Sequence, residues 1–448
     1  MKQDTKYGIR QLILADAIQP TVSSAKHLSH LFFCGSYFAK YRKVGILLLL
    51  IIVFTGCRAR HFVRTTPQMN VEPQFWVRVL LLDDIKSCKL MAHSAFSVIN
   101  SQTQAAEAHF GQLNEPANII MSGGRIVIAG RTFTDEKTII LPDVPHIFEL
   151  NDDSYRGKLM LIVNADDNSF DVINLVPLEP YLAGVVGAEM PDYWEPAALQ
   201  AQAVAARTYC LYIKRHFGPK RTWDVKRTEA NQVYLGVGAE SARVWDAIYR
   251  TWGQVLTCRQ TSDTAELFPA YYSSTCGGHT ENSKHVFGDS LGPLVGVPCP
   301  YCKEVAKPSF FFWPMVQFDN ATITNKILQG YPKLKKLGRV TDVIPVKQSN
   351  YAGFSRLTLV KLVGSTAESA FLRAEDLRLT IDPTGRRIKS TSCKIVSKDD
   401  KWAFLSGRGY GHGVGMCQCG AQALARKGRT AREILLYYYP GSELIIIY

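Results

Sequence analysis

The sequence predicts an α+β fold in which a small β-rich region precedes a mixed region with antiparallel strands and a few helices. Between Trp76 and Val176, the apolar runs VRVLLL, RIVIAG, TIILP, KLMLIVN and FDVINLV are separated by turn residues such as Asp-Asp and Gly-Gly, as is typical of strands. From Pro180 to His216 the pattern becomes helical. The later elements show no strict alternation of strand and helix, so a doubly wound sheet is not expected.

Two local patterns predict elements further along the chain. Residues 339–346 and 355–364 read as antiparallel strands around a polar turn at 348–353. Thr430 and Glu433 have the spacing of a capping box, which predicts a last helix over Ala431–Tyr438.

Length and composition agree with a globular chain behind a tail. The chain has 448 residues, of which 46% are apolar and 20% are charged, enough for one large or two moderate domains. We expect an export leader over residues 1–57, a linker over 58–74, the β-rich region over 75–170 and the mixed region, which carries the candidate chemistry, over 171–448.

The predicted leader has the order of a secretion signal. Lys40, Arg42 and Lys43 precede an apolar run at 44–54, which is too short to span a bilayer core of ~30 Å comfortably. The FTGC that follows resembles a bacterial lipobox, which predicts cleavage and lipidation at Cys57. An uncleaved signal anchor is the alternative. Either form attaches the protein to the cytoplasmic membrane and makes it face outward, in the periplasm or outside the cell.

The positive charge gives little support to a nucleic-acid partner. The formal net charge is +13, but residues 1–60 hold nine Lys and Arg against two Asp and Glu, which is about half of the excess. No basic patch with interleaved aromatic residues follows the leader. We therefore expect no nucleic-acid binding.

One carboxylate has unusual surroundings. Glu189 has the apolar neighbours Val185, Val186 and Met190 and lies in what reads as a connection between two helices, the second of which begins at Pro196. If this connection folds inward, burial raises the pKa of Glu189 and suits it to act as a general acid. The alternative is a glutamate that points into water, as most do.

Two pairs of metal-ligand residues have the spacing of a structural zinc site. Cys276 and His279 form C-x2-H, and Cys299 and Cys302 form C-x2-C. Four such ligands leave no open position, so the predicted zinc would hold loops in place. A disulfide within the set, or free thiols, are the alternatives. The reserve ligands are His285, Cys417 and Cys419.

A glycine-rich block at 406–421 surrounds Tyr410 and His412. Alternate glycines let a backbone approach a ligand closely. The block lacks G-K-[ST] and the dinucleotide fingerprint, so phosphate binding is not expected. It would suit a glycan, with Tyr410 stacked on a sugar and His412 bonded to a hydroxyl or N-acetyl group. Alternatively, the glycines simply let a strand pass close to the next helix.

Five segments together resemble the stage II sporulation protein D family. They are LEPYLAGVVGAEMP, AQAVAARTY, QVYLG at 232–236, STCGGHTEN at 274–282 and SGRGYGHGVGMCQCGAQALA at 406–425. The resemblance implies a lytic transglycosylase that cuts peptidoglycan glycan strands, with Glu189 as the catalytic acid. Three departures from the family pattern are Gln200 in place of Lys, Ser273 in place of His, and cysteines at 417 and 419.

Several side chains in and near these segments are expected to bind the sugar. Arg207 is unusual in so apolar a helix, and it either pairs with an acid or reaches the site. The full set of residues expected to bind the sugar is Arg207, Tyr209, Tyr234, Tyr410, His412 and Gly413.

A lytic transglycosylase needs one carboxyl group, whereas a hydrolytic glycosidase usually needs two. The group protonates the glycosidic oxygen and then takes the proton of the C6 hydroxyl, which closes a 1,6-anhydro ring. The alternative is a non-catalytic, glycan-binding enhancer of a cell-wall amidase, since the family includes such proteins. The expected partners are therefore peptidoglycan strands and an amidase or another envelope protein. A zinc hydrolase is not expected, because no H-E-x-x-H is present.

Overall fold

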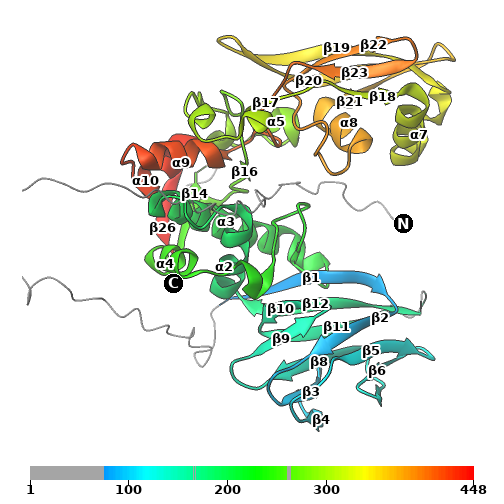
Figure 1. The fold of residues 1–448 in the computed structure, drawn as a ribbon, viewed down its shortest axis with the longest axis vertical. Coiled ribbons are helices and arrows are strands. Elements are labelled where there is room, and N and C mark those ends of the chain that lie inside the picture. The colour runs from blue at the N-terminus through cyan, green and yellow to red at the C-terminus, as the bar shows by residue number, and fades with distance from the viewer. Residues whose placement is uncertain (1–74, 165, 167, 260–263) are drawn as a thin grey trace, which may run out of the picture. The chain divides into compact units, whose positions relative to one another are not determined.

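The computed structural model describes residues 75–448 apart from 165, 167 and 260–263, and it has the predicted α+β character (Figure 1). The predicted leader, Cys57 and the whole predicted linker, up to residue 74, lie outside the described residues. Within the described part of the chain, no helix is long and apolar enough to cross a bilayer.

Strands dominate the first hundred described residues, and each apolar run named above forms the body of a strand. These strands are β1 (Trp76–Ile85), β2 (Ser87–Met91), β3 (Phe96–Asn100), β4 (Ala106–Phe110), β5 (Ala117–Ser122), β6 (Arg125–Ile128), β7 (Arg131–Phe133), β8 (Lys137–Pro142), β9 (Ile147–Leu150), β10 (Asp153–Arg156), β11 (Lys158–Asn164) and β12 (Ser169–Pro177). With β13 (Val225–Lys226) they form a seven-stranded sheet in the order β13-β1-β12-β11-β8-β3-β4 and a six-stranded sheet in the order β10-β9-β2-β5-β6-β7.

The seven-stranded sheet leads directly into the helical part. β12 pairs antiparallel with β1 and β11, and its last residue, Pro177, is the N-cap of helix α2 (Leu178–Glu189). The connection Met190–Glu195 then leads to α3 (Pro196–Phe217), which begins with the predicted proline. Glu189 is thus the last residue of α2, which corrects the expectation that it lies in the connection. The glycines at 184 and 187 lie inside α2, where a Cβ would collide with Tyr234 and with the backbone oxygen of Ala239, so close packing accounts for glycine within a helix that extends further than predicted.

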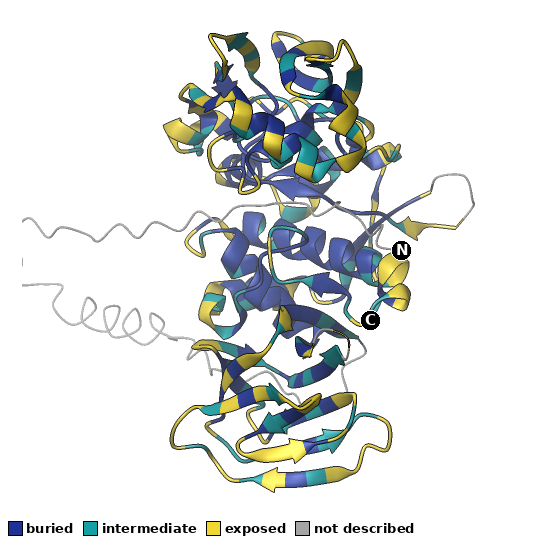
Figure 2. Ribbon diagram, turned by 90° about the vertical axis from the view of Figure 1, so that its right-hand side faces the viewer, coloured by how far each residue is buried: buried dark blue, intermediate teal, exposed yellow. Residues whose placement is uncertain are grey.

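Helix α3 forms the centre of the main hydrophobic core. It is buried along most of its length, as the dark blue helices of Figure 2 show. It contacts α4 (Ala242–Arg250), α9 (Gln418–Arg426) and α10 (Ala431–Tyr438). The predicted capping box of α10 is present, because the hydroxyl of Thr430 accepts from the backbone N–H of Glu433, whose carboxylate accepts from the backbone N–H of Thr430.

Short elements connect these helices. They are η2 (Gly218–Lys220), η3 (Gly236–Ala239), β14 (Gln254–Cys258), β15 (Glu266–Leu267), β16 (Tyr272–Ser273), α5 (Ser283–Val286), η4 (Gly292–Leu294), η5 (Cys302–Glu304), α6 (Pro308–Phe311), β25 (Met416–Cys417) and β26 (Glu443–Ile446). β14 lies between β15 and β26 in one small sheet, and β16 pairs with β25 in parallel. The second pair brings the glycine-rich block beside the segment that carries Cys276.

A second hydrophobic core lies between residues 313 and 404. Its elements are β18 (Val316–Asp319), α7 (Asn320–Gly330), η6 (Pro332–Leu337), β19 (Val340–Tyr351), β20 (Phe354–Gly364), β21 (Ser369–Arg373), α8 (Ala374–Ile381), β22 (Lys394–Lys398) and β23 (Lys401–Leu405). The predicted hairpin of β19 and β20 is confirmed, but its turn is shorter than expected. Ala352 and Gly353 both have positive φ, which suits a two-residue turn.

The chain enters and leaves the second core through one pair of strands. β17 (Phe312–Trp313) leads the chain into it, and β24 (Gly407–Arg408) leads the chain out. These two strands pair antiparallel, Phe312 with Arg408 and Trp313 with Gly407. The chain therefore leaves and returns between the cysteine-bearing segment and the glycine-rich block.

Candidate functional site

The side chain of Glu189 is enclosed by the protein. It is only 1% exposed. Its Oε1 accepts a hydrogen bond from the backbone N–H of Val233 at 3.0 Å, and its Oε2 accepts one from Nε2 of Gln418 at 3.4 Å. Burial raises the pKa of Glu189 to about 8, although both hydrogen bonds act in the opposite direction. The carboxyl group therefore keeps its proton near neutral pH, as a general acid must.

Helix α9 supports the chain on both sides of this acid. Gln418 also donates to the backbone oxygen of Glu189 at 3.3 Å. One turn further along the helix, Oε1 of Gln422 accepts from the backbone N–H of Glu195 at 2.8 Å. The two glutamines thus hold both ends of the connection that follows α2. Their place in the family-like segment 406–425 is the one sequence signal that could have found them.

A large cleft opens between residues of the two cores. Its volume is about 890 Å³, and its walls are rich in aromatic residues. They include Tyr209, Trp223, Tyr271 and Phe287 from the main core and its surroundings and Tyr331 from the second core. This size and lining are typical of a small-molecule or glycan site.

The cleft and Glu189 are linked through one short segment. Asn231 lines the cleft and donates to the hydroxyl of Tyr209 at 3.2 Å, and Val233 binds Glu189. The side chain of Glu189 is not among those that line the described walls of the cleft. The short chain from Asn231 to Val233 therefore connects the wall of the cleft with a hydrogen-bond partner of Glu189.

The wall of the cleft holds another carboxyl group, which the sequence did not indicate. Burial raises the pKa of Asp289, and the hydroxyl of Tyr271 donates to its Oδ2 at 3.3 Å. Its Oδ1 is buried without a hydrogen-bond partner among the described residues. A carboxyl group with a raised pKa in a cleft is a second candidate for acid chemistry.

Of the six predicted sugar-binding residues, the structure places only Tyr209 at the cleft. Arg207 is fully buried and forms an ion pair with Glu179, with 2.6 Å between Nη2 and Oε2. Tyr234 is 1% exposed, and its hydroxyl donates to the side-chain oxygen of Asn174. These contacts stabilise the core and leave neither side chain a free surface, which corrects the expectation that Arg207 and Tyr234 bind a sugar.

The glycine-rich block packs in the same way. The backbone N–H of Val414 donates to Nδ1 of His412, whose Nε2 bonds to the backbone oxygen of Tyr272 at 2.9 Å, so both ring nitrogens are occupied. Burial lowers the pKa of His412 to about 4, and the ring is neutral at pH 7. The ring of Tyr410 is 5% exposed and lies edge-on to Phe310. The block therefore follows the packing alternative.

Gly413 has a packing role as well. Its φ is +77°, and a Cβ at this position would lie 2.6 Å from Nη2 of Arg356. The guanidinium of Arg356 comes from β20 of the second core and donates to the backbone oxygen of Cys276 at 2.9 Å. The glycine therefore leaves room for an arginine that joins three segments.

Four cysteines converge to form a candidate metal centre. The sulfur atoms of Cys276, Cys299, Cys302 and Cys417 all lie within 4.8 Å of one another, and all four side chains are buried. The separation between Cys276 and Cys302 is 3.8 Å, close to the edge of ~3.8 Å that a tetrahedron with Zn–S bonds of ~2.3 Å requires. The donor set therefore fits one zinc ion.

This set differs from the predicted one at a single position. His279 is absent from the group, and Cys417, one of the reserve ligands, takes its place. The ring of His279 instead stacks on Tyr351 at 3.8 Å, and its Nδ1 bonds to the backbone oxygen of the next residue. The glycines at 277 and 278 both have positive φ and turn the chain, so the C-x2-H spacing does not bring both side chains to one point.

The two other reserve ligands have partners outside this group. The sulfur of Cys419 accepts from the hydroxyl of Thr275 at 3.1 Å. Nδ1 of His285 lies 2.9 Å from Oε1 of Glu281. Neither is needed to complete the four-cysteine set.

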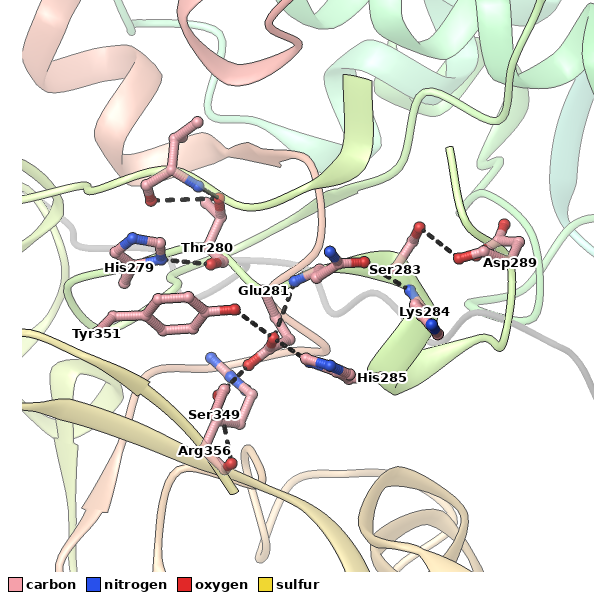
Figure 3. A network of polar contacts seen from close by, with 12 residues as sticks. His279, Thr280, Glu281, Ser283, Lys284, His285, Asp289, Ser349, Tyr351 and Arg356 are labelled. Atoms are coloured by element: carbon pink, nitrogen blue, oxygen red, sulfur yellow. Dashed lines mark hydrogen bonds and ion pairs between the residues drawn. The ribbon is translucent and has the colours of Figure 1, made fainter. Parts of the chain in front are cut away.

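A buried carboxylate joins the cysteine-bearing segment to the second core (Figure 3). Glu281 accepts from the hydroxyl of Ser349 at 2.5 Å and from that of Tyr351 at 2.7 Å, and it pairs with His285. Burial opposes its ionisation, but these donors and the nearby Arg356 hold the pKa of Glu281 below its usual value. The ionised carboxylate is therefore part of the folded structure.

Comparisons with known proteins support the resemblance found in the sequence. Residues 166–258, which include Glu189, match a family model described as Stage II sporulation protein. An uncharacterized protein of Brachyspira hyodysenteriae is 32% identical over 66% of this chain and 74% of its own length. Stage II sporulation protein D of Bacillus subtilis is 28% identical over 60% of this chain and 74% of its own length. An amidase enhancer of Bacillus subtilis is 30% identical over 59% of this chain and 40% of its own length.

Proposed function

Because this chain belongs to the stage II sporulation protein D family, which has a cell-wall related role, we propose that it is an exported lytic transglycosylase that cleaves peptidoglycan glycan strands. One observation carries this proposal. Glu189 is enclosed and proton-bearing near pH 7, and it lies within the span that the family model matches. Its neutral form is the one that the first step of the reaction uses.

In the proposed reaction Glu189 acts twice. It gives its proton to the glycosidic oxygen as the bond from that oxygen to C1 of the muramic acid breaks. The resulting carboxylate then takes the proton of the C6 hydroxyl of the same sugar, and O6 bonds to C1. The products are a free hydroxyl on the leaving sugar and a 1,6-anhydro end, with no water consumed and Glu189 protonated again.

The aromatic cleft is the proposed binding site for the strand. Aromatic rings bury the apolar faces of sugars well, and the 890 Å³ volume suits more than one sugar ring. Strand binding would have to displace the segment 231–233 to bring the glycosidic oxygen to Glu189. Such a conformational step is common in enzymes that exclude water.

A second candidate function is a non-catalytic enhancer of a cell-wall amidase. The relative from Bacillus subtilis that bears the name amidase enhancer favours it, as does the 1% exposure of Glu189. Two departures from the family pattern point the same way. Gln200 lies half-buried on α3 in place of Lys, and Ser273 is buried with no partner for its hydroxyl among the described residues.

We also propose that the four cysteines hold a structural zinc ion. Contacts behind the sulfur atoms support this role, because Cys417 accepts from the backbone N–H of Cys276 at 3.3 Å and Cys299 lies 3.1 Å from the hydroxyl of Tyr438. A closed set of four thiolates suits a structural rather than a catalytic ion. The ion would join the segment 276–302 to the start of α9.

The proposed location is the outer side of the cytoplasmic membrane. The basic and apolar order of the leader and the FTGC at 54–57 support export, with either a lipid on Cys57 or an uncleaved anchor. Mass analysis of the protein purified from membranes would distinguish a lipidated Cys57 from an intact leader.

The decisive experiment is digestion of purified peptidoglycan followed by mass analysis of the fragments. The wild-type protein should release anhydro-ended sugars, and Glu189→Gln should abolish their release. Glu195→Gln, which changes an exposed carboxylate six positions away, is the matched control and should remain active. If Glu189→Gln still releases anhydro-ended sugars and Asp289→Asn does not, the catalytic acid is Asp289 in the wall of the cleft. No release by any form, with a faster reaction of an added amidase, would favour the enhancer.

A further inference from the structure

The carboxyl group of Glu189 has two different hydrogen-bond partners. Oε1 faces the backbone N–H of Val233, which can only donate. A protonated Oε1 would leave that donor without a good acceptor, so the proton belongs on Oε2. The partner of Oε2 is Gln418, whose side chain carries an N–H₂ donor and a carbonyl acceptor on the same planar group.

Gln418 is held on a rigid support. It is the first residue of α9 and follows Cys417, which pairs with Ser273 in the β16–β25 ladder and accepts from the backbone of Cys276. Its side chain is 2% exposed, so few positions of the amide are open to it. In this position its N–H₂ group faces two oxygens of Glu189, the backbone oxygen at 3.3 Å and Oε2 at 3.4 Å.

We propose that Gln418 is a positioning residue for proton transfer at Glu189, because its N–H₂ group is held where it donates to the carboxylate and stabilises the ionised form. The inference rests on the proposed function of Glu189. The acid holds its proton on Oε2 until a glycosidic oxygen arrives. The N–H₂ of Gln418 then stabilises the carboxylate that is left until the C6 hydroxyl returns a proton.

Two other titratable groups interact electrostatically with Glu189. Glu229 is half-buried, and its negative charge raises the pKa of Glu189. The hydroxyl of Tyr272 is fully buried, and burial keeps its pKa far above neutral, so it does not ionise in the range of interest. A Glu229→Gln background removes the contribution of this charge to the pKa of Glu189.

The chain offers a matched control for Gln418. Gln422 lies one turn further on α9 and is also 2% exposed, but its side chain binds the backbone of Glu195 rather than the carboxyl group of Glu189. Gln418→Leu and Gln422→Leu remove the same amide from the same helix. Only the first should change the proton affinity of Glu189.

The test is an infrared titration of the full-length protein, in which the carboxylic acid C=O band of Glu189 is assigned by its loss in Glu189→Gln. Gln418→Leu should raise the midpoint by about one pH unit, because it removes a donor to a charged group. Gln422→Leu should leave the midpoint unchanged. If Gln418→Leu does not fold, Gln418→Asn, which withdraws the amide by one methylene, should raise the midpoint in the same direction.

The pH profile of anhydro-sugar release is the second measurement. Its alkaline limb should move with the infrared midpoint in Gln418→Leu, while the maximum rate falls at least about tenfold. An unchanged midpoint in both Gln418 variants, or an equal shift in Gln422→Leu, would overturn the inference. If the midpoint shifts in Gln418→Leu but Glu189→Gln keeps full activity, the contact between Gln418 and Glu189 is supported and the proposed function is refuted.

Discussion

Replacing Glu189 by Gln should make the folded protein more stable than the wild type at alkaline pH, by an amount that follows from the burial of this side chain. Burial raises the pKa of this carboxyl group from 4.5 to about 8. A group whose pKa is raised on folding favours the folded state fully below its unfolded pKa, and this contribution is lost as the pH rises through the folded pKa. Between about pH 4.5 and pH 8, Glu189 is ionised in the unfolded chain but still protonated in the folded protein. The free energy of unfolding of the wild-type protein therefore falls as the pH rises through this range.

The size of the effect follows from the shift. Each pKa unit corresponds to about 1.4 kcal/mol, so the wild-type protein should lose about 4 kcal/mol between pH 5 and pH 9 through this group. Gln at position 189 does not titrate, keeps the acceptor for Val233 and can bond to Gln418. The free energy of unfolding of the variant relative to wild type should thus rise by about 4 kcal/mol over this interval.

Urea unfolding of both proteins at several pH values between 5 and 9 measures this difference. All other titrating groups are common to the two proteins and cancel in it. Glu195→Gln, at an exposed position, should show no such trend. A difference between Glu189→Gln and wild type that stays constant across the range would refute the reasoning, since it would mean that Glu189 is ionised in the folded protein at pH 5.

Three further predictions concern the supporting contacts. By elemental analysis, the purified protein should contain about one zinc ion per chain. Cys417→Ser should lose the zinc and His279→Ala should keep it. Equal loss in both variants would contradict the four-cysteine site. Arg207→Met should lower the free energy of unfolding in urea by about 3–5 kcal/mol, because it leaves the buried Glu179 without its guanidinium; a loss below about 1 kcal/mol would contradict a buried ion pair. Glu281→Gln should lower stability at pH 7 by about 1–3 kcal/mol. Because folding lowers the pKa of Glu281, this difference should shrink in thermal melts as the pH falls through the folded pKa, and a difference independent of pH would show that the carboxylate is not stabilised.

Local patterns predict much of the fold. The alternation in residues 76–176, the proline at the start of α3 and the capping box at Thr430 all act through neighbours in the sequence, and each is confirmed. The expectation that Glu189 lies in a connection is wrong because α2 continues to it, past the glycines at 184 and 187. The second core is not separated from the first in the sequence, because its strands and helices resemble their surroundings in composition.

The candidate site is harder to predict because it is built from distant segments. Gln418 lies 229 positions from Glu189, and no local pattern connects the two. For Arg207 the sequence allows either an acid partner or the site, and only the fold places Glu179 beside it. In the cysteine group, spacing identifies three of the four residues, whereas Cys417 is brought there by the β16–β25 pair.

Because β17 and β24 pair with each other, the second core is an insertion whose two ends lie side by side. The insertion begins after Trp313 and ends before Gly407, and these two residues pair with each other. The insertion could therefore become longer or shorter, or be replaced, during evolution without a change in the path of the flanking chain. Arg356 and the hydroxyl partners of Glu281 limit such changes, because they lie in the insertion and bind residues outside it. A replacement module would have to supply a guanidinium and a pair of hydroxyls at the same points, which gives a simple criterion for grafting.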